Sequence, residues 1–104
     1  MKKKVAILQS NYIPWRGYFD LINEVDEFIF FDESQYTKND WRNRNHIKTN
    51  DRSSWLTIPI KKMKLGTPIS QVEFSNRDWI SKHLKTINQF YQNCNYYHLV
   101  YEDF

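Results

Sequence analysis

Side chains that form directional hydrogen bonds crowd the segment TKNDWRNRN, residues 37–45, which has no apolar periodicity. Arg42 and Arg44 lie two residues apart, so in an extended segment they would point the same way. Paired guanidinium groups bind phosphate or carboxylate through bidentate hydrogen bonds. Asp40 is placed to orient one of them, and we expect Trp41 to anchor the segment in the core. Solvated loops ordinarily contain Gly, Pro or Ser, and this segment has none. We therefore favour an anion-binding segment over a plain loop with a buried Trp.

Two other polar clusters directly follow apolar runs. The first contains Gln9, Asn11, Tyr12 and Trp15, and the second contains Asp32, Gln35 and Tyr36. In open α/β sheets, ligands bind beyond the carboxyl ends of the strands. We expect the carboxamides to read polar groups of a ligand and one aromatic ring to stack on it. The alternatives are a structural turn with a buried Trp for the first cluster, and a helix cap or surface charge for Asp32.

Proton transfer has three candidates, which are Asp32, Asp40 and His83. His83 falls on or beside the apolar face of a predicted helix, where a hydrogen-bonded core histidine is the commoner role and a general acid or base the alternative. His46 and His98 have no metal-ligand spacing with it. The sequence therefore predicts no metal site.

The strands and helices that position these groups are predicted from the apolar pattern, which indicates an α/β domain. Residues 4–8 form a continuous apolar run, typical of a strand covered on both faces. Apolar residues from Tyr18 to Val25 recur at helical spacing, and residues 26–32 form a second apolar strand. Strand, helix and strand in this order predict a βαβ unit, and hence a mainly parallel or mixed sheet with flanking helices.

Further elements are expected along the rest of the chain. These are strands in residues 46–49, 54–60 and 69–74, a helix in 75–93 capped by Ser75 or Asn76, and an apolar element in 96–104 that ends at Phe104. That last element still needs packing partners. We therefore expect the 104 residues to be a single domain and the N-terminal portion of a longer protein.

Composition narrows the classes of function. The net charge is +3, from 15 Lys and Arg against 12 Asp and Glu, so the strongly basic stripe of a nucleic-acid binder is absent and a small anionic substrate fits better. A single cysteine, Cys94, excludes an intrachain disulfide and fits a reducing cytoplasm. No apolar run is long enough to cross a membrane. The oligomeric state stays open.

The chain resembles the WbqC-like protein family. The resemblance rests on VAILQSNYIPWRGYFDLI, FFDESQYTKNDWRNRNHIKT, WLTIPI and WISKHLKTINQFY, which occur in the same order over nearly the whole chain. The most distinctive piece is QYTKNDWRNRN. On matching positions the resemblance implies the signature residues Gln9, Asn11, Tyr12, Pro14, Trp15, Tyr18, Asp32, Gln35, Tyr36, Asp40, Trp41, Arg42, Asn43, Arg44, Lys48 and Trp55.

The resemblance implies a role in bacterial surface polysaccharide (O-antigen) biosynthesis. It points to a group transferase acting on a nucleotide-linked amino sugar, with aminoacyl or glycyl transfer as one form. The residues expected to bind such a substrate are Gln9, Asn11, Tyr12, Trp15, Gln35, Tyr36, Arg42, Asn43 and Arg44. Two alternatives stay open, namely a sugar-nucleotide or glycan binding module without chemistry and a nucleic-acid-binding domain.

A second likeness concerns architecture. A strand, a polar loop with Pro14, a helix and a second strand with a Gln-containing loop look like nucleotidyltransferase-type Rossmannoid enzymes such as pantothenate synthetase. In such enzymes a HIGH-type signature binds ATP, whereas YIPWRG stands at residues 12–17 here. ATP as a cofactor is therefore implied by fold analogy alone.

Overall fold

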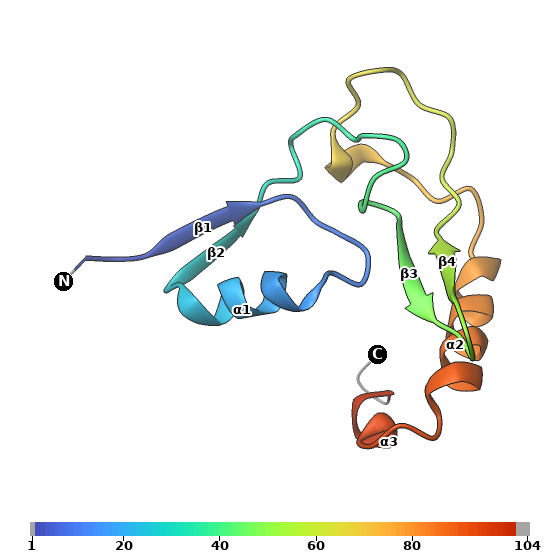
Figure 1. The fold of residues 1–104 in the computed structure, drawn as a ribbon. Coiled ribbons are helices and arrows are strands. Elements are labelled where there is room, and N and C mark those ends of the chain that lie inside the picture. Colours follow the sequence, from blue (N-terminus) through green and yellow to red (C-terminus); the bar gives the residue numbers. More distant parts are fainter. Residues whose placement is uncertain (1, 102–104) are drawn as a thin grey trace.

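Two short apolar strands pair in parallel near the N-terminus of the computed structural model, which describes residues 2–101. Helix α1 (Arg16–Glu24) connects β1 (Val5–Leu8) to β2 (Glu27–Phe30), so the expected βαβ unit is confirmed (Figure 1). Phe28 packs against Tyr18 of α1, with their ring centres 5.4 Å apart, and Tyr18 is buried. The helix therefore covers one face of the parallel pair.

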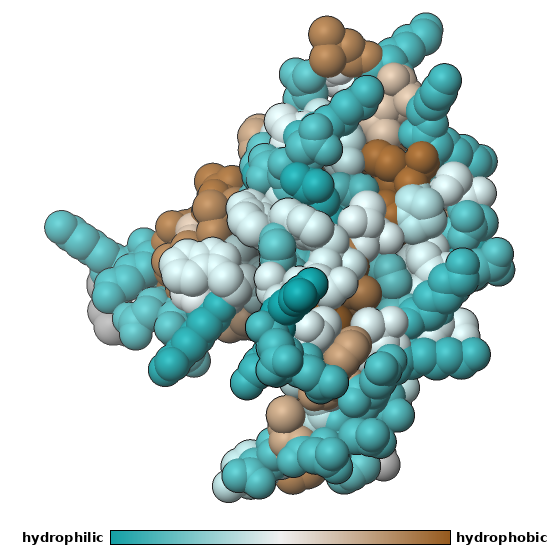
Figure 2. Space-filling view, turned by 45° about the vertical axis from the view of Figure 1, so that its right-hand side comes forward, coloured by the Kyte–Doolittle hydropathy of each residue, from teal (hydrophilic) through white to brown (hydrophobic). Residues whose placement is uncertain are grey.

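The opposite face of this pair is open, so the expectation that residues 4–8 are covered on both faces is wrong. Val5, Ile7 and Ile29 are 47%, 56% and 41% exposed. On the face of the molecule drawn in Figure 2, exposed apolar side chains (brown) lie between polar side chains (teal). A continuous apolar run indicates only that both faces of a strand can be buried. The cover itself must come from other elements, and residues 2–101 supply it on one face.

A β-hairpin packed on a helix forms the second half of the structure. Strands β3 (Arg44–Lys48) and β4 (Ser53–Thr57) are antiparallel, and Ile47 and Leu56 on their inner face are each 6% exposed. Helix α2 (Asp78–Tyr91) lies along the hairpin (Figure 1), where the Lys48 amide donates to the Tyr91 hydroxyl at 2.6 Å. One parallel and one antiparallel pair confirm a mixed α/β fold.

The strand expected in residues 69–74 is wrong. The chain there forms a 3₁₀ helix, η1 (Ile69–Gln71), and Phe74 makes only an isolated bridge to Ile60. The amides of Ile69 and Ser70 donate to carbonyls of Ser34 and Asp32 at 2.9 and 2.8 Å, so they join the loop after β2 and not a sheet. Within residues 2–101, no strand pairs with this segment to form a ladder beyond that isolated bridge.

The C-terminal helices agree better with the pattern. Helix α2 begins three residues later than the expected start. The expectation that Ser75 or Asn76 caps it is wrong, because the N-cap residue is Arg77, whose side chain makes no capping hydrogen bond. Asn76 lies one residue earlier and accepts a hydrogen bond from the Asp78 amide at 3.0 Å. The apolar element after it is a short helix, α3 (Tyr97–Tyr101), and Phe104 lies outside the described residues. No helix among residues 2–101 is long and apolar enough to cross a membrane.

His83 joins the two halves of the molecule. It is 8% exposed, and its Nε2 lies 3.1 Å from the Thr57 carbonyl oxygen, while its Nδ1 lies 2.8 Å from the Tyr12 hydroxyl. A carbonyl only accepts, so Nε2 carries the proton and Nδ1 accepts from Tyr12. Burial lowers the pKa of His83, which the Thr57 hydrogen bond partly offsets, and burial raises the pKa of Tyr12 to about 12. Both side chains are therefore neutral near pH 7, and the prediction of a hydrogen-bonded core histidine is confirmed.

The buried neutral imidazole predicts a loss of stability in acid. The ordinary pKa of 6.5 is lowered in the folded state, so the contribution is complete above 6.5 and decreases as the pH falls through the folded-state pKa, because only the unfolded chain binds the extra proton. We expect His83→Gln to lose this part of the pH dependence, measured by urea unfolding between roughly pH 5 and pH 7.5. His98→Gln, on the exposed surface of α3, should retain it. An unchanged pH profile in His83→Gln would contradict the assignment.

Candidate functional site

The loops that follow β1 and β2 meet at one edge of the parallel pair. The Ser10 amide and hydroxyl donate to the two carboxylate oxygens of Asp32, at 3.0 and 2.7 Å. The Gln9 carboxamide donates to the Ser34 hydroxyl at 2.8 Å. Carboxyl ends of neighbouring parallel strands lie side by side, which is why the two loops are within bonding distance. Asp32 thus holds the two loops together, and its role in proton transfer stays a prediction.

Arg42 reaches this edge from the other half of the molecule. Its Nη2 donates to Oε1 of Gln9 and its Nη1 donates to Oδ1 of Asn11. The side chain is 14% exposed, and its Nε has no hydrogen-bond partner. The Asp40 carboxylate lies 3.8 Å from Nη2, beyond hydrogen-bond length. The guanidinium group is therefore held mainly by neutral amide oxygens.

Residues 38–43 fold as successive turns and bends, which corrects the expectation of an extended segment. Asp40 accepts hydrogen bonds from the Trp41 amide at 2.7 Å and the Thr37 hydroxyl at 2.9 Å. These bonds, the Trp41 one first, lower the pKa of Asp40. Asn39 adopts φ +57°, which asparagine tolerates better than most residues. Side-chain hydrogen bonds thus replace glycine and proline in shaping this turn.

Arg44 has neighbours different from those of Arg42. Its guanidinium carbon lies 4.2 Å from the ring centre of Trp55, and its Nη2 donates to the Asn39 carbonyl at 3.0 Å. Strand alternation does not relate the two arginines, because Arg42 precedes β3 in a turn and Arg44 begins the strand. The structure therefore brings Arg42, and not Arg44, to the amides of the first loop. Joint binding of an anion by both stays a prediction.

A hollow of about 320 Å³ lies beside the bonded amides and is lined by Asn11, Pro14, Trp15, Trp41 and Asn45. Trp41 is 47% exposed, so the expectation that it anchors the segment in the core is wrong. Its ring instead lies 5.7 Å from that of Trp55, measured between centres. The hydrogen bonds of Asp40 already hold the turn, which leaves the Trp41 ring free to form a wall of the hollow.

Trp15 forms another wall. It is 71% exposed and precedes the first turn of α1. A Cβ placed on Gly17 would collide with the six-membered part of the Trp15 indole ring. The missing side chain at position 17 is thus what lets the ring fold back over the start of the helix.

Of the predicted binding residues, only Asn11 and Trp15 line the hollow. Gln9, Arg42 and Arg44 lie outside its lining, as do Tyr12, Gln35, Tyr36 and Asn43. Tyr12 directs its hydroxyl to His83, and Asn43 donates to the Ile58 carbonyl at 2.9 Å. Gln35 pairs through its backbone in an isolated bridge, and the Tyr36 amide donates to a loop carbonyl at 2.8 Å, while burial raises the pKa of the Tyr36 phenol. These contacts hold segments of backbone together, and a direct role of these residues in binding stays a prediction.

Asn45 is a lining residue that sequence analysis missed. Its Nδ2 donates to the carbonyls of Ile13 and Tyr12 at 2.6 and 3.1 Å. It belongs to the same polar run as the arginines, but nothing in the run distinguishes a carboxamide facing a loop from one facing solvent. Within residues 2–101, no group of three or more His, Cys, Asp or Glu side chains is placed to hold a metal ion.

Comparison with known proteins gives the family. The model of the WbqC-like protein family matches residues 9–104. A protein of Mycobacterium tuberculosis named "Uncharacterized protein Rv1507c" is 54% identical over 86 residues, which are 82% of this chain and 37% of that protein. The chain thus spans little more than a third of the length of this relative. No solved structure matches. A match across this much of the chain shows that it belongs to the WbqC-like protein family.

Proposed function

We propose that this chain supplies the anion-recognising part of a transferase in bacterial surface polysaccharide biosynthesis, which acts on a nucleotide-linked amino sugar, for example by aminoacyl transfer. The observation that carries the proposal is the position of Arg42 between the amides of Gln9 and Asn11, beside a hollow with two tryptophan walls. The polysaccharide role and the substrate class follow from the resemblance to the family, and the site supports the anionic part of that substrate.

The charge of Arg42 favours an anionic ligand. A mostly buried guanidinium is costly unless its charge is balanced, and amide oxygens balance it less well than a carboxylate or phosphate. The Asp40 carboxylate, 3.8 Å away, also accepts two hydrogen bonds within its own turn. Arg42 therefore retains attraction for a further anion. Its side chain is 14% exposed, whereas its unpartnered Nε is buried and does not face the solvent.

The walls of the hollow favour a ligand that also carries a ring. Trp15 and Trp41 offer flat apolar faces, and Asn11 and Asn45 add polar groups that donate and accept. A volume of about 320 Å³ suits part of a nucleotide sugar, because drug-sized ligand pockets begin near about 300 Å³. A base or sugar ring against the tryptophans, with its phosphate toward Arg42, satisfies both features.

A binding module without chemistry is the second candidate. The three groups expected to transfer protons are already bonded within the protein, Asp32 to Ser10, Asp40 to its own turn, and His83 to Tyr12 and Thr57. General acid–base catalysis requires hydrogen-bond reach to the substrate, whereas binding does not need these groups to be free.

Calorimetric titration of the chain with uridine diphosphate N-acetylglucosamine, followed by a turnover assay with an activated amino acid, separates these possibilities. Binding with turnover supports the transferase, and binding without turnover supports the module. If the chain binds none of a panel of nucleoside-diphosphate amino sugars, both the transferase and the binding module are contradicted. Titration with an oligonucleotide at increasing salt tests the remaining alternative, for which we expect weak binding that salt removes.

Replacement of Arg42 tests the anion site directly. We expect Arg42→Gln to weaken binding of uridine diphosphate N-acetylglucosamine at least roughly tenfold, because a hydrogen bond to a charged group contributes about 1.5–3 kcal/mol. Arg42→Lys should recover only part of the affinity, since a lysine cannot hold two amides and an anion in one plane. Arg52→Gln, the same change of charge in the exposed β3–β4 turn, serves as the control. Equal losses in Arg52→Gln and Arg42→Gln would indicate a general charge effect and contradict the site.

Gly17→Ala tests the tryptophan wall without touching a polar group. The added methyl group displaces the Trp15 ring, and we expect binding of the nucleotide sugar to weaken several-fold. The melting temperature should not fall, because alanine is favoured over glycine in a helix by about 1 kcal/mol and the exposed indole is free to turn aside. Asn23→Ala, at an exposed position of α1, controls for helix propensity. Unchanged affinity in Gly17→Ala would remove Trp15 from the site.

A further inference from the structure

Ile13 holds a backbone conformation that its side chain disfavours. Its φ of +46° lies in the left-handed region, which β-branched residues rarely enter because Cβ approaches the following carbonyl. Such a conformation persists only where surrounding contacts impose it. Ile13 lies between Asn11 and Trp15, which both line the hollow, so whatever imposes the conformation also sets the positions of those two side chains.

The carboxamide of Asn45 is fully engaged at this point. Its Nδ2 donates to the Ile13 carbonyl at 2.6 Å and to the Tyr12 carbonyl at 3.1 Å, while its Oδ1 accepts from the His46 amide at 2.7 Å. Two donated bonds and one accepted bond define which way the amide is turned. Asn45 lies on β3 opposite Leu56. The carboxamide that bonds the loop is therefore held by the paired strands of the hairpin.

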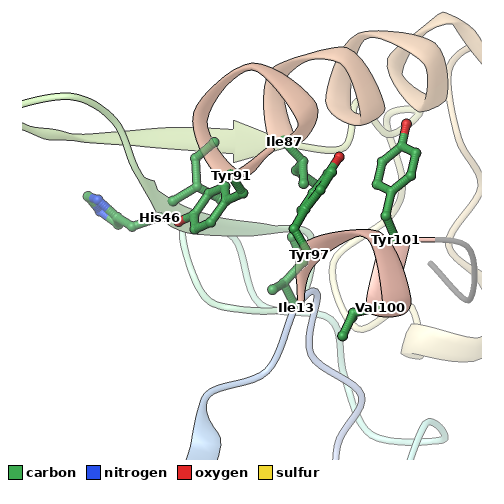
Figure 3. A pocket seen from close by; sticks show the side chains of 8 residues that line it. Ile13, His46, Ile87, Tyr91, Tyr97, Val100 and Tyr101 are labelled. Carbon is green, nitrogen blue, oxygen red and sulfur yellow. The ribbon is translucent and has the colours of Figure 1, made fainter. Parts of the chain in front are cut away.

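The Ile13 side chain is held separately from its carbonyl. It lines an apolar cavity of about 290 Å³ together with Ile47 of β3, Ile87 of α2 and Tyr97 of α3. Figure 3 shows Ile13 at the end of the first loop, entering this cavity beside α3. A left-handed turn allows the side chain to enter the apolar cavity while the carbonyl faces Asn45.

We infer that Asn45 is a positioning residue of the proposed site: its two donated hydrogen bonds hold Ile13 in the left-handed conformation and thereby keep Asn11 and Trp15 around the hollow. The inference rests on the proposed function for its ligand, although the positioning itself is a property of the protein alone. Without these bonds, residue 13 relaxes toward negative φ, and the chain on either side of it turns away from Arg42 and Trp41.

The test uses the 104-residue chain with the variants Asn45→Ala and Asn76→Ala. Both remove a carboxamide that bonds to backbone, but Asn76 lies just before α2, accepts from the Asp78 amide and does not line the hollow. We expect Asn45→Ala to weaken binding of uridine diphosphate N-acetylglucosamine at least fivefold and to shift the NMR signals of the Asn11 amides and the Trp15 indole. Asn76→Ala should do neither. If Asn45→Ala does not fold, Asn45→Ser replaces it in the same measurements.

A double-mutant cycle with Ile13→Gly provides a readout that a merely structural role would not move. Glycine accepts positive φ without strain, so the effect of Asn45→Ala on affinity and on the Trp15 signal should be smaller in the Ile13→Gly background than in the parent chain. Equal effects in the two backgrounds, or unchanged Asn11 and Trp15 signals in Asn45→Ala, would overturn the inference. Should the parent chain bind no nucleotide sugar, the proposed function fails, and the NMR arm of the cycle still decides the role of Asn45.

Discussion

The structure depends on the hydrogen bonds that fasten the loop after β1 to the hairpin and to α2. Asn45 bonds two carbonyls of this loop, Arg42 bonds two of its carboxamides, and His83 bonds the Tyr12 hydroxyl. The parallel pair and the hairpin share no strand pairing. Their relative placement therefore relies on these polar side chains, on the backbone hydrogen bond from the Tyr12 amide to the Trp41 carbonyl at 3.0 Å, and on the packing of Ile13 in the apolar cavity. The polar side chains must keep their partners, because a buried polar group without one is costly.

This dependence on polar contacts explains the composition of residues 37–45. Asp40 and Asn39 shape turns, Asn43 and Asn45 bind distant carbonyls, and Arg42 crosses to the first loop. Hydrogen bonds are directional, so the same contacts that join the halves also hold the hollow in one shape. The residues that organise the fold and those that form the candidate site are thus largely the same. A function for this segment does not compete with a structural role.

Local patterns predicted much of the fold. The βαβ unit and α2 were predictable because short continuous apolar runs indicate strands and apolar residues at helical spacing indicate helices, and both patterns are local. The strand in residues 69–74 and the two-sided cover of β1 were wrong, because both required partners that local patterns do not report. Trp41 was placed in the core on residue type alone, although an exposed ring that packs on Trp55 has the same sequence signal.

The amino-acid sequence by itself determined the family, the order of strand, helix and strand, and the presence of two polar loops at one sheet edge, since each follows from local pattern or from residue identity. Only the tertiary structure decided that Arg42 meets Gln9 and Asn11 while Arg44 stacks on Trp55, and that Asn45 grips a strained Ile13. The partners of Arg42 and Asn45 in the first loop are 31 to 33 residues away along the chain. The packing of the hairpin against the first loop brings them together, and the spacing of residues in the sequence does not indicate that contact.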